Sequence, residues 1–158
     1  MFANIATGPS TGTSYEFPRL GKLSFENSVA NPNSGLQTVV LGTDDATPGQ
    51  VYMYAGAKTN SGNDIDRAGL TNGNLFGVKV NTTNPDRFES RTSGFDGTSG
   101  NNDNQTFSLV PLGNVQNTPG TTIQADSATA SVTEFLRPED IAWDPNNAAK
   151  AYFVTTDR

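Results

Sequence analysis

The chain has 158 residues, a formal net charge of −6 and a hydrophobic fraction of only 34%, with no cysteine and no histidine. Disulfides, thiolate or imidazole metal ligands and catalysis by cysteine or histidine are therefore excluded. The acidic balance argues against binding to nucleic acid, and no apolar run reaches the roughly 18–20 residues of a membrane-spanning helix.

The N-terminal residues 1–14 are expected to form a tail or linker, followed by one β-propeller-like domain over residues 15–158. They lack the basic region and the apolar core of a signal peptide. The nine Phe and four Tyr residues argue against full disorder. An acidic, Asn-rich and cysteine-free surface suits a calcium-rich setting, because calcium takes oxygen ligands. We therefore expect an extracellular or periplasmic location.

Six short runs rich in β-branched and aromatic residues, bounded by turn formers, predict strands. In chain order they are Leu36–Thr43, Gln50–Gly56, Asn74–Val80, Thr106–Val110, Asp140–Trp143 and Ala151–Thr156. The first two runs predict a hairpin around the loop Asp44–Gly49. The last two predict a second hairpin around the turn Asp144–Asn147.

Helical signals are few. One turn is expected at Ile65–Leu70 and two short turns at Thr129–Leu136, while Phe88–Gln105 has the composition of a long loop. The segment Asn63–Gly69 lacks the full pattern of a calcium-binding loop, so an ordinary turn is expected there. The predicted fold class is all-β.

The predicted architecture is a partial β-propeller of short antiparallel strands with long loops. A four-stranded blade takes roughly 40–50 residues, so 158 residues supply about three blades, whereas a closed propeller needs at least four.

Several segments occur together in an order that resembles the PhoX-type alkaline phosphatases. They are Gly21–Ala30, Leu41–Asp45, Val51–Tyr54, Leu136–Asp140 and Ala151–Thr155. The chain is similar to these secreted β-propeller phosphatases, and especially to their cyanobacterial relatives, the phosphatase or phytase-like esterases. The similarity runs from about Tyr15 to Arg158 and covers a middle portion of a family member, which is several times longer.

The resemblance implies a site on the propeller axis, where carboxylates from different blades hold iron and calcium ions around a phosphate ester. Glu26 matches a family glutamate, Asp44 and Asp45 match a pair of aspartates, and Glu139 matches the glutamate of an Arg-Pro-Glu-Asp segment. These four residues are the expected metal ligands, with Asp45 preferred over Asp44. Arg137 is expected to orient its loop or to face phosphate, and no catalytic residue is assigned.

Each of these residues also has an ordinary explanation. Glu26 resembles an exposed strand residue, Asp44 and Asp45 a turn-capping pair, and Glu139 a surface partner of Arg137. From the sequence alone both explanations stay open.

The chain also departs from the family pattern. Phe25 stands where the family often has histidine, and the family's cysteine iron ligand and further carboxylates are missing. We therefore expect a fragment or truncated relative of a phosphate-monoester hydrolase that is inactive alone. Remaining blades, or copies in a homo-oligomer, would complete the site. The alternative is a structural or adhesive extracellular protein that assembles through open strand edges.

Overall fold

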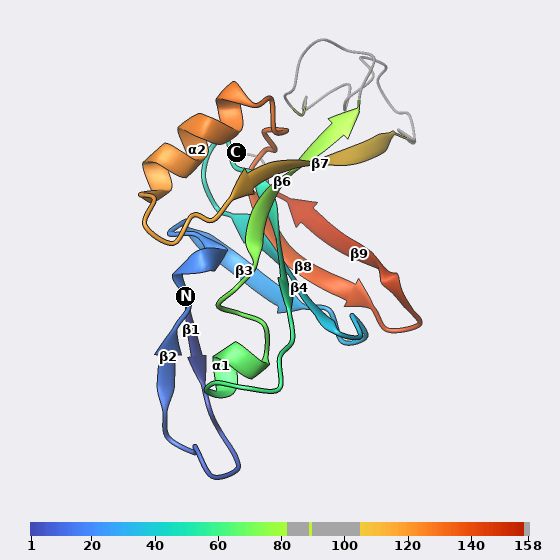
Figure 1. The fold of residues 1–158 in the computed structure, drawn as a ribbon. Helices are drawn as coiled ribbons and strands as arrows, with labels where there is room; N and C mark the ends of the chain where they lie inside the picture. Colours follow the sequence, from blue (N-terminus) through green and yellow to red (C-terminus); the bar gives the residue numbers. More distant parts are fainter. Residues whose placement is uncertain (82–88, 90–104, 157–158) are drawn as a thin grey trace.

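A computed structural model describes residues 1–81, 89 and 105–156 of the chain. Nine strands form three antiparallel sheets in this part, with a few short helices beside them (Figure 1). The prediction of an all-β fold is confirmed. Apart from Glu89 and Gln105, the predicted loop Phe88–Gln105 lies outside the described residues.

The central feature is a five-stranded antiparallel sheet in which each strand pairs with the next one along the chain. Its strands are β3 (Phe25–Ala30), β4 (Gln37–Asp44), β5 (Val51–Ala57), β6 (Asn74–Asn81) and β7 (Thr106–Gly113). The predicted hairpin is confirmed as β4 and β5, where Leu41 lies opposite Met53. The strand β3 was not among the six predicted runs, because its sequence is mostly polar or small.

Two hairpins complete the strands. The first joins β1 (Phe2–Asn4) to β2 (Ser14–Glu16), so the segment expected as a tail or linker folds back and packs Met1 and Ala3 against the core. The second joins β8 (Pro138–Asp144) to β9 (Asn147–Thr155), as predicted. The three sheets have two, five and two strands, so the described part does not show the expected four-stranded propeller blades.

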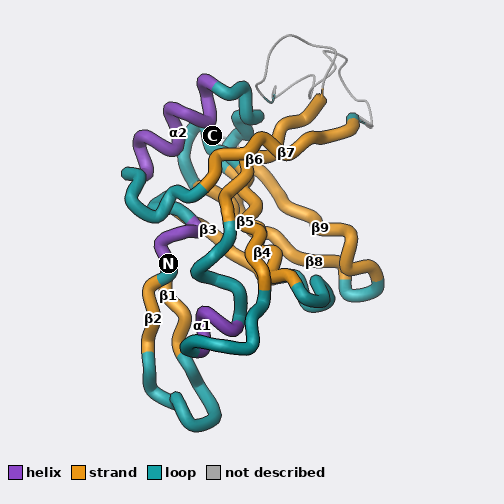
Figure 2. Tube along the Cα trace, viewed as in Figure 1, coloured by secondary structure: helices purple, strands orange, loops and turns teal. Residues whose placement is uncertain are grey.

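The five-stranded sheet separates two apolar clusters, because successive side chains on a strand point to opposite faces. Tyr52 and Tyr54 of β5 face a cluster that includes Phe17 and Ile123. Val51 faces the other cluster, which the β8–β9 hairpin covers (Figure 2). The last cluster contains Ile141 and Phe153, together with Phe135, whose ring meets that of Phe153 edge to face at 5.1 Å between centroids.

In the described part of the chain, three short helices lie outside the sheets: η1 (Pro18–Leu20), α1 (Asp64–Arg67) and α2 (Gly120–Thr129). The turn expected at Ile65–Leu70 corresponds to α1, whereas the prediction of turns at Thr129–Leu136 was wrong. The helix α2 ends where those turns should begin. Only Ile123 and Ser127 of α2 are buried, so it lacks an apolar stripe that a sequence pattern could reveal. None of the described helices is long and apolar enough to cross a membrane.

The segment after α2 runs alongside β6. Thr133 N donates to Val78 O at 3.1 Å, and the Thr133 hydroxyl accepts from Val80 N at 2.8 Å. Phe135 then exchanges two backbone hydrogen bonds with Gly49, at 2.7 and 3.1 Å. These bonds hold the start of β8 beside the β4–β5 loop.

Candidate functional site

Arg137 lies between two of the predicted acidic residues. Its Nε donates to Asp45 at 2.9 Å, and a terminal nitrogen of its guanidinium group lies 2.9 Å from Glu139 Oε1. The Arg137, Asp45 and Glu139 side chains are all partly exposed to solvent. Residues 92 positions apart in the sequence therefore meet at the point where the β4–β5 loop passes the start of β8. We call Glu26, Asp45, Arg137 and Glu139 the Arg137 cluster.

Glu26 joins this cluster through its charge. The pairing of β3 with β4 slips by one residue, because Phe25 lies opposite Asp44 and Asn27 lies opposite Thr43. Glu26 is thus the extra residue of a β-bulge, a feature that redirects a side chain at the edge of a sheet. The carboxylate of Asp45 raises the pKa of Arg137 most, and the charges of Glu139 and Glu26 raise it further.

The backbone of Arg137 is held in an uncommon conformation. Its φ angle is 56°, in the left-handed region that side chains other than glycine seldom adopt. Its N–H donates to Phe135 O at 3.1 Å, and its carbonyl accepts from Thr156 N at 3.0 Å. Backbone of this kind persists where surrounding contacts fix it, and it occurs more often at functional sites.

Three residues that the sequence did not single out support the cluster. The buried Thr43 hydroxyl donates to Glu139 O at 2.6 Å, and the Thr156 hydroxyl donates to the Glu139 carboxylate. The Glu89 carboxylate accepts from Leu136 N at 2.9 Å and from the Thr155 hydroxyl at 3.0 Å. Hydroxyl groups and an isolated glutamate have no distinctive spacing, so no sequence signal could have found them.

The hydrogen-bond partners of the Asp44 side chain are Ser24 and Gln124, and not Arg137. Its side chain is fully buried, and its two oxygens accept from Ser24 N at 3.2 Å and from Gln124 Nε2 at 2.7 Å. Burial raises the pKa of Asp44, while these two hydrogen bonds act in the opposite direction. Its hydrogen bonds connect the end of β4 to α2, so we assign it a structural role.

A polar pair lies beside Asp44 within the core. The hydroxyl groups of Tyr52 and Ser127 are 3.1 Å apart, and Ser127 also donates to Ile123 O at 2.7 Å. Burial raises the pKa of Tyr52, and the charges of Asp44 and Glu134 add to this effect. Tyr52 therefore stays protonated at neutral pH and acts as a neutral hydrogen-bonding group.

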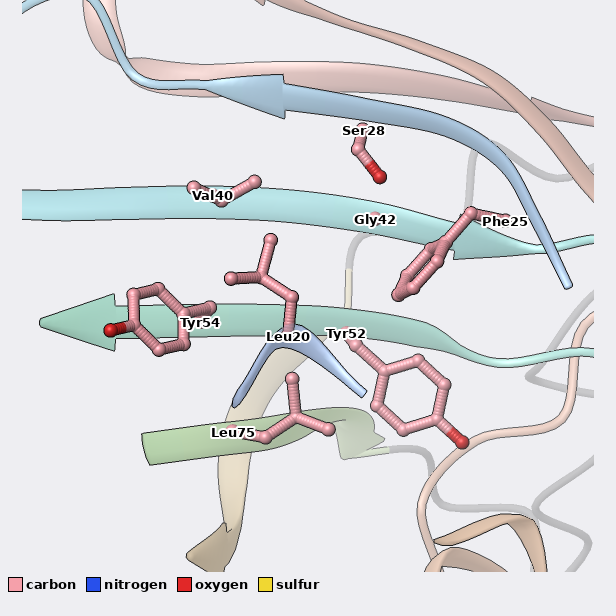
Figure 3. A pocket seen from close by; sticks show the side chains of 8 residues that line it. All are labelled: Leu20, Phe25, Ser28, Val40, Gly42, Tyr52, Tyr54 and Leu75. Carbon is pink, nitrogen blue, oxygen red and sulfur yellow. The ribbon is translucent and has the colours of Figure 1, made fainter. Parts of the chain in front are cut away.

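A small cavity lies between η1 and the sheet, lined by Leu20, Phe25, Ser28 and Tyr52 among others (Figure 3). Its volume is about 10 Å³, which is close to the space that one water molecule needs. The Ser28 hydroxyl is buried and has no hydrogen-bond partner among the described residues. The volume of this cavity is far smaller than the roughly 300 Å³ of a pocket that binds a small molecule.

The placement of the predicted ligands can be compared with the requirements of a metal ion. Calcium takes six to eight oxygens and ferric iron also favours carboxylates, so the chemistry of these residues is suitable. However, the guanidinium group of Arg137 binds Asp45 and Glu139, and the described residues contain no group of three or more acidic side chains placed to hold an ion. As placed, they do not fit the expected iron and calcium cluster.

Comparisons with models of protein families, with curated proteins and with solved structures each find no match to this chain.

Proposed function

We propose that the Arg137 cluster is one part of a metal-dependent site for phosphate-ester hydrolysis of the PhoX type, and that the chain alone is inactive. One observation supports the proposal. Residues selected from separate segments as members of one site lie together, with Arg137 bound to both Asp45 and Glu139. Arg137 and Glu139 are close in the chain, so the informative contact is the one that brings in Asp45 from 92 residues away.

The formal charge of the cluster favours a cation as its first ligand. One guanidinium group against three carboxylates leaves two formal negative charges, so a phosphate group alone would be repelled. Oxygen ligands and excess negative charge suit a hard divalent ion such as calcium. In this proposal the ion binds only when Arg137 releases Asp45 and Glu139, and the remaining ligands come from outside the chain, which agrees with the missing cysteine ligand of the family.

Calcium binding to the purified chain, measured by titration calorimetry, tests the proposal. We expect weak binding that Glu26→Gln reduces further. Arg137→Gln should strengthen binding about tenfold, because it removes a positive charge that acts on a divalent ion a few ångströms away. Glu16→Gln is the matched control, since Glu16 is an exposed glutamate on β2 outside the cluster.

Three outcomes would contradict the proposal. Absence of calcium binding in both the wild type and Arg137→Gln would show that the cluster is only an ion-pair network. Turnover of a simple phosphate monoester by the chain alone, lost in Glu139→Gln, would show that the site is already complete. An effect of Glu16→Gln equal to that of Glu26→Gln would mean that general charge, and not the cluster, attracts the ion.

The alternative of a filament built through open strand edges receives less support from the geometry. A head-to-tail array of sheets needs two complementary open edges. At the β3 edge, the Trp143 indole N–H donates to Val29 O at 3.2 Å, and the Asn31 amide donates to Ala148 O at 2.6 Å. The β8–β9 hairpin thus occupies one end of the five-stranded sheet.

A further inference from the structure

Within the described residues, the other end of the five-stranded sheet is an unpaired edge. The last strand, β7, pairs with β6 on one side, and no strand among residues 1–81 and 105–156 pairs with its outer side. Phe107 is 64% exposed and Leu109 is 37% exposed. An exposed edge strand of this length is a template for pairing with another strand.

The absence of charged residues in β7 favours pairing with another uncharged strand. The chain carries a net charge of −6, yet β7 contains no charged residue between Thr106 and Gly113. Edge strands are commonly protected by charged side chains, lysine above all. The strand β9 has such a charge in Lys150, whereas β7 has none. Two copies of an acidic chain can therefore approach each other at β7 without bringing like charges together there.

We propose that this chain forms a two-fold symmetric dimer in which the β7 strands of two copies pair antiparallel and join their sheets. Pro111 has no N–H to donate, so the pairing segment is Thr106–Val110. With the axis at Ser108, Phe107 of one copy lies opposite Leu109 of the other, on the same face. Apolar pairs of this kind are the stabilising units of an antiparallel sheet.

The side chains on the two faces of β7 differ in their contacts. Asn81 at the end of β6 donates to the Thr106 hydroxyl at 3.1 Å and accepts from the Ser108 hydroxyl at 3.0 Å. Thr106 and Ser108 therefore face Asn81, and the alternation along the strand places Phe107 and Leu109 together on the opposite face. The polar side chains of Thr106 and Ser108 are therefore hydrogen-bonded to β6, while Phe107 and Leu109 form an exposed apolar pair on the opposite face that suits pairing with an identical copy.

The proposed dimer is independent of the proposed phosphatase site. The Arg137 cluster lies where β3 and β4 meet β8, at the other end of the sheet order from β7. Two copies joined through β7 hold their clusters apart and do not combine them. Dimer formation and calcium binding can thus fail separately, because they depend on different residues.

Sedimentation equilibrium on the full chain over a range of concentrations tests the dimer. We expect a reversible monomer–dimer equilibrium that tightens as ionic strength rises, because salt screens repulsion between acidic copies. Leu109→Lys should weaken dimerisation at least about tenfold, since it places an unpaired charge opposite Phe107 of the second copy. Val154→Lys is the matched control, because Val154 is an exposed apolar residue on β9, 55% exposed.

The register has its own test. The double variant Phe107→Lys/Leu109→Glu places a lysine opposite a glutamate at both ends of the pair, so it should dimerise more tightly than either single variant. In the wild type, amide hydrogen exchange at Thr106–Val110 should slow as protein concentration rises, a measurement that needs no variant to fold.

Three results from sedimentation, and one from hydrogen exchange, would overturn the proposal. The sedimentation results are a wild type that stays monomeric at every concentration, assemblies larger than a dimer, and dissociation by Val154→Lys equal to that by Leu109→Lys. Unchanged exchange at β7 in a chain that does dimerise would place the interface elsewhere and would also reject it.

Discussion

Asp44 and Asp45 show how one position along a strand decides what a carboxylate does. Asp44 is the last residue of β4 and is buried against Ser24 and Gln124, whereas Asp45 is bound to Arg137 at the surface. The sequence predicts that this pair ends a strand, but it cannot show which residue faces inward. That choice depends on the register of β4 with its neighbours and on a helix that no pattern predicts.

The raised pKa of Asp44 predicts a pH-dependent cost of burial. Because folding favours the protonated carboxyl group, the stability from Asp44 is fully present below about pH 3.8 and is lost as pH rises through the raised folded-state pKa. Relative to the wild type, Asp44→Asn should therefore become more stable as pH rises, by up to about 1.4 kcal/mol per pH unit. Urea denaturation at a series of pH values measures this difference.

Asp66→Asn provides a control with the opposite sign. Hydrogen bonds from the Thr71 hydroxyl and from Asn63 lower the pKa of Asp66. Its stability contribution is therefore present above pH 3.8 and is lost as pH falls through the lowered value. The difference between wild type and Asp66→Asn should shrink in acid, and the same trend for both variants would contradict our assignment of Asp44 as a carboxylate disfavoured by burial.

At the scale of elements, six of the nine described strands were predictable, whereas β1, β2, β3 and the longest described helix were not. The β4–β5 and β8–β9 hairpins consist of β-branched or aromatic runs around clear turn formers, so local sequence specifies them. The helix α2 follows Pro119 and buries only Ile123 and the polar Ser127. The buried Ser127 hydroxyl is hydrogen-bonded to Ile123 O and to Tyr52, which is 75 residues away, and a local sequence pattern does not reveal such a distant partner.

Gly77 fixes how the segment after α2 packs on β6. A side chain at Gly77 would overlap both γ methyl groups of Val132, which is fully buried. Gly77→Ala should therefore destabilise the protein by about 1–3 kcal/mol, the usual effect of overpacking a core. Chemical denaturation of the variant, with far-ultraviolet circular dichroism as the signal, measures this change.

A double-mutant cycle separates overlap from other effects of alanine. Val132→Ala alone should destabilise by leaving a cavity, but it provides the space that the new methyl group needs. The double variant Gly77→Ala/Val132→Ala should thus be more stable than the sum of the two single changes predicts. Simple additivity would mean that Val132 does not limit the space at Gly77.

At the scale of the whole molecule, the sequence predicted the members of the Arg137 cluster only through a family resemblance. Separations of 19 and 94 residues between Glu26, Asp45 and Glu139 carry no spatial information by themselves. Three features bring Asp45 and Arg137 into contact. The β4–β5 loop carries Asp45, the backbone hydrogen bonds between Gly49 and Phe135 hold the two segments side by side, and Arg137 has a left-handed backbone conformation. Long-range pairings of this kind arise from the complete fold and leave no periodic signal in the chain.

The two apolar clusters share one sheet, and this arrangement predicts a single cooperative unfolding transition. Tyr52 and Val51 are neighbours on β5, yet each belongs to a different cluster, so loss of the sheet removes both at once. Trp143 is the only tryptophan and donates to Val29 O on β3, so its fluorescence reports the docking of the β8–β9 hairpin. Far-ultraviolet circular dichroism reports the backbone of all strands and helices together, and the five-stranded sheet is the largest of the described sheets.

The two signals should give the same midpoint in urea, because a single small domain usually unfolds in one step. Val51→Ala, which removes buried apolar volume beneath the hairpin, should lower both midpoints together. If fluorescence instead changes at lower urea than circular dichroism, the hairpin undocks first and is a separate unit of stability. In that case the Arg137 cluster would come apart before the sheet, because Arg137 and Glu139 enter it from the hairpin side while Asp45 is held by the sheet.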